Sequence, residues 1–246
     1  MTPLAQALLF PDWPAPANVG ACVTTRAGGV SLPPYDTFNL GDHVGDAPQA
    51  VAENRQRLSS TLQVRPAWLK QVHGVDVAHA DPERVCQADA CWTSTPGIAC
   101  TAMTADCLPV LFCDRAGSRV AAAHAGWRGL AAGVLEATLD TLAIAPDQVL
   151  VWLGPAIGPQ AFEVGLEVRE AFTRQHPEAH TAFVPGEQPG KLLADIYALA
   201  RIRLAARGIT AVYGGGLCTV SDPRFYSYRR TPQGGRFASL VWLKPR

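Results

Sequence analysis

Neither sign of charge is in excess in this sequence, because 21 lysine and arginine residues balance 21 aspartate and glutamate residues among 246 residues. A neutral chain has no general attraction to nucleic acid or to an anionic membrane, so we expect neither as a partner. No stretch approaches the roughly 18 consecutive apolar residues that a membrane-spanning helix needs. The stretch 1–10 lacks the basic segment that begins a signal peptide. These absences predict a cytoplasmic protein whose seven cysteines are free thiols.

Several motifs that would fix a function are also missing. No two cysteines are separated by two residues, which excludes a zinc ribbon. The glycine-rich fingerprints of dinucleotide-binding folds and of P-loop enzymes are absent, so both classes lose support. None of the six histidines forms a His-x-His pair, which disfavours an oxidase with a multicopper cluster.

What is present is typical of a folded α/β protein. Hydrophobic residues make up 48% and charged residues 17%, which excludes disorder, while 22 glycines and 20 prolines divide the chain into short segments. We expect a single domain over residues 1–246, an α/β (α+β) layered sandwich of mixed sheets with flanking helices. The expected helices are 48–62, 130–142, 164–174 and 192–207. The expected strands are 20–25, 67–72, 88–93, 98–104, 108–113, 119–124, 148–153, 211–213, 225–228 and 237–243.

The most informative segment is the pair of apolar runs on either side of residues 114–118, whose composition suits a hairpin loop. An antiparallel hairpin centred near Ala116 pairs residues whose numbers add to about 232. Cys107 and His124 then lie at the same open end, with Cβ atoms roughly 5–8 Å apart. A helix begins just beyond, near Leu130. The sequence therefore predicts that a cysteine and a histidine meet at a strand end, where chemistry is favoured.

Two chemistries remain open for this pair. A thiolate and an imidazole are ligands for a metal ion, and they are equally the nucleophile and base of a cysteine hydrolase. His73 is a third candidate, because it lies with Gly74 at a tight turn between two short apolar runs. The other cysteines are not assigned a function, and those inside apolar runs are expected in the core.

Several motifs in the same order resemble one family. They are 39–41 (Asn-Leu-Gly), 53–55 (Glu-Asn-Arg), 71–74 (Gln-Val-His-Gly), 105–110 (Ala-Asp-Cys-Leu-Pro-Val), 123–129 (Ala-His-Ala-Gly-Trp-Arg-Gly), 154–159 (Gly-Pro-Ala-Ile-Gly-Pro) and 225–230 (Phe-Tyr-Ser-Tyr-Arg-Arg). Together they resemble the YfiH-like family, formerly labelled laccase-like or polyphenol oxidase and now described as purine nucleoside phosphorylases. The resemblance runs from about residue 24 to the C-terminus.

The resemblance implies one zinc ion held by His73, Cys107 and His124. Two imidazoles and one thiolate leave the fourth tetrahedral position for water or substrate, as in catalytic zinc sites. These three residues and Asp106 are the expected catalytic residues. Asp106 is expected to orient a ligating imidazole or accept a proton, unless it only caps the local backbone.

The implied reactions are phosphorolysis of adenosine, inosine or guanosine, with cleavage of methylthioadenosine and deamination of adenosine also attributed to the family. The expected partners are therefore purine nucleosides and phosphate; the oligomeric state is left open. Guanidinium groups suit phosphate, and the candidates are Arg26, Arg55, Arg128, Arg229 and Arg230, with Arg55 and Arg128 favoured. The resemblance adds Asn39 and Ser227 to the expected substrate-binding residues.

Four alternatives compete with this reading. The family's former label implies a copper polyphenol oxidase, since a His₂Cys set also suits blue copper, but the paired histidines of a multicopper cluster are missing. A metal-independent Cys–His hydrolase would use Cys107 and His124 alone. The resemblance also brings a role in editing peptidoglycan precursors, with a cell-wall nucleotide conjugate as substrate. A protein that only binds would show no turnover of any nucleoside.

Overall fold

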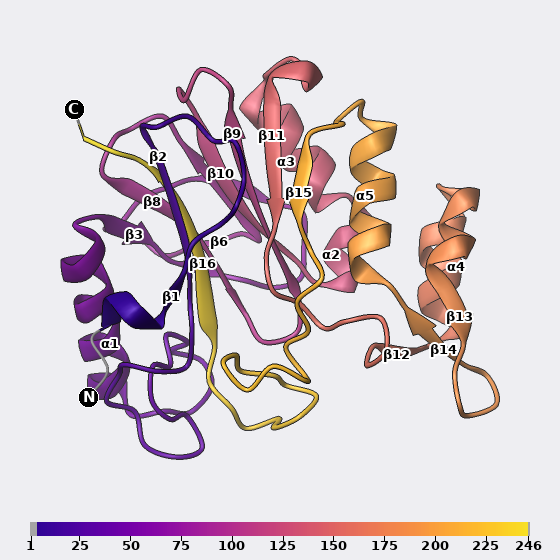
Figure 1. The fold of residues 1–246 in the computed structure, drawn as a ribbon, viewed down its shortest axis with the longest axis horizontal. Coiled ribbons are helices and arrows are strands. Elements are labelled where there is room, and N and C mark those ends of the chain that lie inside the picture. The colour runs from indigo at the N-terminus through magenta and orange to yellow at the C-terminus, as the bar shows by residue number, and fades with distance from the viewer. Residues whose placement is uncertain (1–3, 246) are drawn as a thin grey trace.

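Four layers form the protein in the computed structural model, which describes residues 4–245 (Figure 1). Helix α1 covers one sheet, a second sheet packs against the first, and the helices α2, α3 and α5 cover the far side of the second sheet. The expected fold class, a layered sandwich of mixed sheets with flanking helices, is confirmed.

The first sheet has five strands in the order β1-β2-β16-β8-β3, and only the β3–β8 pair is parallel. The strands are β1 (Leu8–Leu9), β2 (Val19–Thr24), β3 (Arg65–Ala67), β8 (Ile98–Thr104) and β16 (Phe237–Leu243). The second sheet has six strands in the order β15-β11-β9-β10-β7-β5, with parallel pairs at both edges. Its strands are β5 (Val77–His79), β7 (Ala90–Thr93), β9 (Leu108–Asp114), β10 (Val120–Ala125), β11 (Val149–Leu153) and β15 (Val212–Gly214).

Smaller elements complete the fold. The strands β12 (Glu163–Gly165), β13 (Phe183–Pro185) and β14 (Lys191–Ala194) form a three-stranded sheet, and β4 (Leu69–Lys70) pairs with β6 (Cys86–Gln87). The α-helices are α1 (Pro48–Leu62), α2 (Trp127–Ala132), α3 (Val134–Leu142), α4 (Leu166–Thr173) and α5 (Ile196–Ala206). The 3-10 helices are η1 (Leu4–Ala7), η2 (Pro146–Gln148) and η3 (Pro177–Ala182). None of the helices described in residues 4–245 is long and apolar enough to cross a membrane.

Both faces of each sheet are buried, which explains why the strands read as continuous apolar runs. In β9, Val110 and Phe112 pack with α3 and α5, whereas Leu111 and Cys113 face the other sheet. Alternation along a strand divides neighbouring residues between two separate parts of the core. The same alternation places His124 on the side of β10 that faces the first sheet, as for Ala122.

Most of the expected elements are present, and the exceptions have local causes. Residues 225–228 do not form a strand, although Phe225 and Tyr226 are buried, because this segment runs through turns. The helix expected over 130–142 is two helices separated by Gly133, whose φ of 109° is open to glycine. The helices expected from 164 and 192 begin later, because their first residues pair in β12 and β14.

The hairpin predicted around Ala116 is present with its register displaced by one residue. Val120 lies opposite Cys113 and His124 lies opposite Pro109. The paired part of β9 begins at Leu108, so Cys107 lies immediately before it. Cys107 and His124 therefore lie at the same open end of the hairpin, as the sequence predicts.

Asn54 on α1 offers a test of how the loops at this end of the sandwich are held. Its amide nitrogen donates to Ser31 Oγ (2.9 Å) and to the carbonyl oxygens of Thr37 (3.3 Å) and Asn39 (2.9 Å), and its side chain is fully buried. Because Asn54→Ala removes these hydrogen bonds at a fully buried position, it should lower the free energy of unfolding by about 2–4 kcal/mol in urea titrations. Gln56→Ala, on the exposed side of the same helix, should change it by less than about 0.5 kcal/mol. Equal effects of the two substitutions would contradict this assignment.

Candidate functional site

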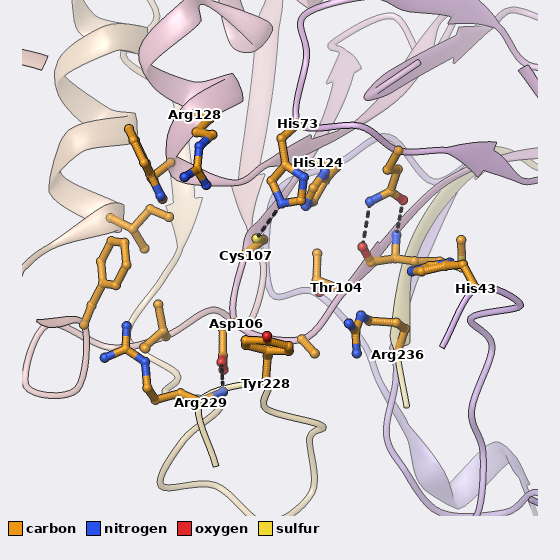
Figure 2. A pocket seen from close by; sticks show the side chains of 17 residues that line it. His43, His73, Thr104, Asp106, Cys107, His124, Arg128, Tyr228, Arg229 and Arg236 are labelled. Carbon is orange, nitrogen blue, oxygen red and sulfur yellow. Dashed lines mark hydrogen bonds between the residues drawn. The ribbon is translucent and has the colours of Figure 1, made fainter. Parts of the chain in front are cut away.

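A cavity of about 580 Å³ opens at the end of the sandwich where β8 and β10 finish (Figure 2). His73, Cys107 and His124 lie together in it. The walls come from segments that are far apart in the chain, and their residues are His43, Gln71, Met103, Thr104, Ala105, Asp106, Trp127, Arg128, Ile157, Phe162, Ile196, Tyr228, Arg229 and Arg236. Its volume lies within the range usual for small-molecule sites.

The three predicted ligand residues converge on one point. One ligand atom from each lies within 4.8 Å of the others, and Cys107 Sγ is 3.7 Å from His73 Nε2. The two imidazole rings are 4.7 Å apart between centroids and meet edge to face. His124 is buried, Cys107 is half-buried and His73 is exposed, so the cluster is open to the cavity on one side.

Backbone geometry brings these side chains within reach of one another. His73 has a φ of 61° and Asp106 has a φ of 91°, both in the left-handed region, and each lies in a tight turn. Gly126 makes the approach of His73 and Cys107 sterically feasible. A Cβ at this position would lie 2.6 Å from His73 Cδ2 and 3.0 Å from Cys107 Sγ.

Asp89, immediately before β7, holds both histidines. Its carboxylate accepts hydrogen bonds from the backbone N–H groups of Val72 (3.1 Å), His73 (2.9 Å) and Gly74 (2.7 Å). The same carboxylate lies 2.8 Å from His124 Nδ1, which leaves Nε2 of that ring for a ligand. Burial raises the pKa of Asp89, but the hydrogen bonds from His124 and Gly74 outweigh it and keep the pKa below its usual value. The sequence analysis missed Asp89, because an aspartate within an apolar run gives no sign of its partners.

The charges of Cys107 and His124 support each other. Burial raises the pKa of the Cys107 thiol. The positive charge of His124 and hydrogen bonds from both histidines outweigh this effect and lower the pKa to about 6. Burial lowers the pKa of His124, whereas Cys107 and Asp89 raise it to about 9. Without metal, these two shifts favour the thiolate form of Cys107 and the imidazolium form of His124.

The donor set fits a metal ion. Two imidazoles and a thiolate suit zinc, and a carboxylate that fixes the ring orientation of a ligating histidine is a usual neighbour of such sites. Within residues 4–245, these residues are the one group of three or more histidine, cysteine or acidic side chains gathered closely enough to bind an ion. Zinc and copper both accept this set of ligands.

Asp106 lies in the pocket but does not orient an imidazole. Its carboxylate accepts hydrogen bonds from Thr219 Oγ1 (2.6 Å) and from the backbone N–H of Arg229 (2.7 Å). It therefore ties the segment containing Arg229 to the strand end beside Cys107. The expected role of positioning an imidazole belongs to Asp89 instead, and a part for Asp106 in proton transfer stays a prediction.

The residues expected to bind substrate divide into two groups. Arg128 and Arg229 line the pocket. Arg55 does not, since its Nε donates to the Leu40 carbonyl (3.0 Å) and its guanidinium covers Trp68. Asn39 and Ser227 are buried and form hydrogen bonds with neighbouring backbone groups. Of the remaining candidates, Arg26 bonds to Asp36 and Arg230 bonds to backbone carbonyls.

Sequence reasoning also missed part of the wall, namely His43, Tyr228 and Arg236. Tyr228 lies within a matched motif, which was a usable signal. His43 and Arg236 carry no local pattern, and only folding brings their loops to the pocket.

A model of the family described as multi-copper polyphenol oxidoreductase laccase matches residues 20–244. The chain belongs to this family. The resemblance found in the sequence is thereby confirmed.

Relatives of this laccase-family chain carry a different label. A protein of Pseudomonas aeruginosa named purine nucleoside phosphorylase is 69% identical over 239 residues, which cover 97% of this chain and 99% of that protein. A protein of Escherichia coli named purine nucleoside phosphorylase YfiH is 56% identical over 241 residues, covering 96% and 98%. The crystal structure of a Neisseria meningitidis protein superimposes with a TM-score of 0.94 at 51% identity, covering 97% of this chain and 100% of that one.

Substitution of Asp89 tests its control of both histidines. Asp89→Asn replaces an acceptor oxygen by an amide donor next to backbone N–H groups and removes the negative charge beside His124. We expect metal affinity to fall about 10- to 100-fold, as for other residues that orient metal ligands. Competition with a chromophoric chelator measures this affinity, and circular dichroism checks the fold. Asp81→Asn, at an exposed turn, is the control, and unchanged affinity in Asp89→Asn would contradict the assignment.

The low pKa of Cys107 predicts that it is alkylated in the metal-free protein at a pH where ordinary thiols react slowly. Because thiolate reacts and thiol does not, iodoacetamide should modify Cys107 with a rate that rises through a midpoint near pH 6. Peptide mapping by mass spectrometry should show Cys22 and Cys113 unmodified, since burial raises the pKa of each to about 12. Zinc should protect Cys107, and equal labelling with and without zinc would argue against its role as a ligand.

Proposed function

We propose that this chain is a zinc-dependent purine nucleoside phosphorylase that holds its metal on His73, Cys107 and His124. The proposed substrates are adenosine, inosine and guanosine, with methylthioadenosine as a further one, and phosphate is the co-substrate. The observation that carries the proposal is the open cluster of three ligand atoms within 4.8 Å of one another at the base of a ligand-sized cavity. The names of the relatives supply the substrate class.

The pocket offers both kinds of surface that a nucleoside and phosphate require. Trp127, Ile157 and Phe162 give it an apolar wall against which a purine ring can pack. Arg128 and Arg229 add positive charge along the same wall (Figure 2). Bound zinc would supply a Lewis acid with one coordination position left for an oxygen or nitrogen atom.

The residues around this position have separate tasks. Asp89 fixes the ring of His124 and the turn that carries His73, so that both imidazoles keep their orientation when substrate enters. Asp106 holds the backbone of Arg229 at the pocket edge. Preorganised groups of this kind lose little entropy on binding, which favours a fixed position of the substrate relative to the metal ligands.

A metal-independent cysteine hydrolase is the second candidate. Cys107, His124 and Asp89 match a nucleophile, a base and a carboxylate that orients the base, in that order. His124 Nδ1 bonds to Asp89, and the ring interacts with the thiol. His73 is the observation against it, since a hydrolase of this type has no use for a second imidazole 3.7 Å from the sulfur.

Incubation of the purified protein with adenosine or inosine, with and without phosphate, tests the proposal. We expect adenine or hypoxanthine and ribose-1-phosphate to appear only when phosphate is present, as identified by chromatography. Inosine formed from adenosine would indicate deamination. Chelation should abolish turnover and added zinc should restore it, whereas a cysteine hydrolase would keep its activity.

Two substitutions connect the metal to the activity. Cys107→Ala and His124→Ala should each remove zinc, measured by elemental analysis, and lower turnover at least about a hundredfold, since each removes a ligand. Cys86→Ala, at a half-buried thiol outside the pocket, should retain both. Full zinc content in the two pocket variants would contradict the ligand assignment. Stoichiometric copper in the wild-type protein would show that the bound metal is copper and not zinc.

A further inference from the structure

The backbone of Arg236, one of the arginines in the pocket, is held by two hydrogen bonds to the segment 39–41. Its backbone N–H donates to Asn39 Oδ1 (2.8 Å), and its carbonyl oxygen accepts a hydrogen bond from the Leu40 N–H (3.0 Å). Gly41 makes room for the arginine stem, because a Cβ at that position would lie 2.9 Å from Arg236 Cγ. The segment 39–41 therefore fixes the backbone and the side-chain stem of Arg236, and buried Asn39 has a structural role beside the pocket.

The guanidinium group of Arg236 has no carboxylate partner. Arg26 and Arg55 pair with Asp36 and Asp42, but no acidic oxygen in residues 4–245 lies within 4.0 Å of Arg236. Burial lowers its pKa, and the negative charges of Cys107 and Asp106 compensate only in part. A half-buried cation without a counter-ion favours the binding of an anion, because a bound anion replaces the missing partner.

The free edge of this guanidinium faces the cavity. Nη1 donates to the carbonyl oxygens of Gly234 and Gly235, each at 3.0 Å, whereas Nε and Nη2 have no partner among the residues described. Figure 2 shows the group directed toward the middle of the pocket, on the opposite side from Arg128 and Arg229. Two adjacent N–H groups in one plane match two oxygens of a tetrahedral anion.

Two further residues accompany Arg236. Tyr228 lies with its ring centroid 6.0 Å from the guanidinium carbon, and His43 lines the same side of the pocket. Burial and the positive charge of Arg236 lower the pKa of His43 against the opposing effect of Asp42, which favours its neutral imidazole. His43 Nδ1 lies 3.5 Å from Asp42 Oδ1, so the one N–H of the neutral ring has a carboxylate beside it, whereas the phenol of Tyr228 can donate a hydrogen bond to an anion without adding charge.

We propose that Arg236, with His43 and Tyr228 beside it, forms the subsite for inorganic phosphate, on the side of the metal ligands opposite Arg128 and Arg229. This inference rests on the proposed phosphorolysis and deepens it, because it divides the pocket between the two substrates. Phosphate then occupies the side of His43 and Arg236, and the nucleoside lies along the apolar wall of Ile157 and Phe162.

Initial-rate kinetics with phosphate and inosine varied separately test this division. Arg236→Gln should raise the KM for phosphate about 10- to 100-fold, the usual effect of losing hydrogen bonds to a charged group. The KM for inosine should stay within about twofold, and zinc content should not change. Arg236→Lys should recover part of the loss, since it restores the charge but not the two-pronged geometry.

Matched variants decide between the two sides of the pocket. Arg128→Gln and Arg229→Gln should leave the KM for phosphate nearly unchanged and raise that for inosine instead. Arg84→Gln, at an exposed arginine away from the pocket, should leave both constants as in wild type. A wild-type KM for phosphate in Arg236→Gln, with a rise in Arg128→Gln or Arg229→Gln, would overturn the proposal.

A measurement on the unmodified protein covers the case in which Arg236 variants do not fold or wild type shows no phosphorolysis. Wild-type crystals soaked in tungstate, a tetrahedral anion with a strong anomalous signal, should show a peak in contact with the Arg236 guanidinium. Absence of turnover together with this peak would refute the phosphorylase and leave the anion subsite standing. A peak at Arg128 or Arg229 alone would refute the subsite.

Discussion

The buried carboxylate of Asp89 is the constraint on which the site depends. It accepts hydrogen bonds from three consecutive backbone N–H groups around His73 and from the ring of His124, so one anion orients two histidines that are 51 positions apart. These bonds compensate the cost of burying its charge. They also hold His73 in a left-handed turn that a non-glycine residue would otherwise avoid. With this geometry fixed, Cys107 Sγ lies within 4.8 Å of a ring nitrogen of each histidine.

The sandwich supplies what Asp89 needs. Central strands buried on both faces end together at one edge of the molecule, where Asp89 and Cys107 lie just before β7 and β9 and His124 lies near the end of β10. Strand interiors contain little besides apolar side chains, so they provide rigidity, while the turns can hold strained or charged groups. A rigid scaffold with polar residues at its strand ends places the three ligand atoms within 4.8 Å of one another without a dedicated binding loop.

Charge is unevenly distributed around the cavity although the chain is neutral as a whole. Thiolate and carboxylate groups lie at its base, and three arginines lie on its walls without an acidic partner in the part of the chain described. The family is described as laccase, yet its relatives are named phosphorylases, and within residues 4–245 one three-ligand group lies beside cationic walls, which suit an anion. Electron transfer among several coppers would require further clusters of histidine.

The sequence by itself determined the layered fold, the hairpin and the meeting of Cys107 with His124, because alternation and a short loop fix pairing locally. The turn between two apolar runs suggested His73, and the motif resemblance gave it the role of a metal ligand. Asp89 and Arg236 could not be found in this way, since each acts on groups distant in the chain through contacts that leave no periodic trace. Likewise, Asn39, Arg55 and Ser227 resemble site residues in sequence but bond to the framework behind the pocket. Only the tertiary structure decided which polar side chains face the cavity, because burial depends on the packing of separate loops and not on local pattern.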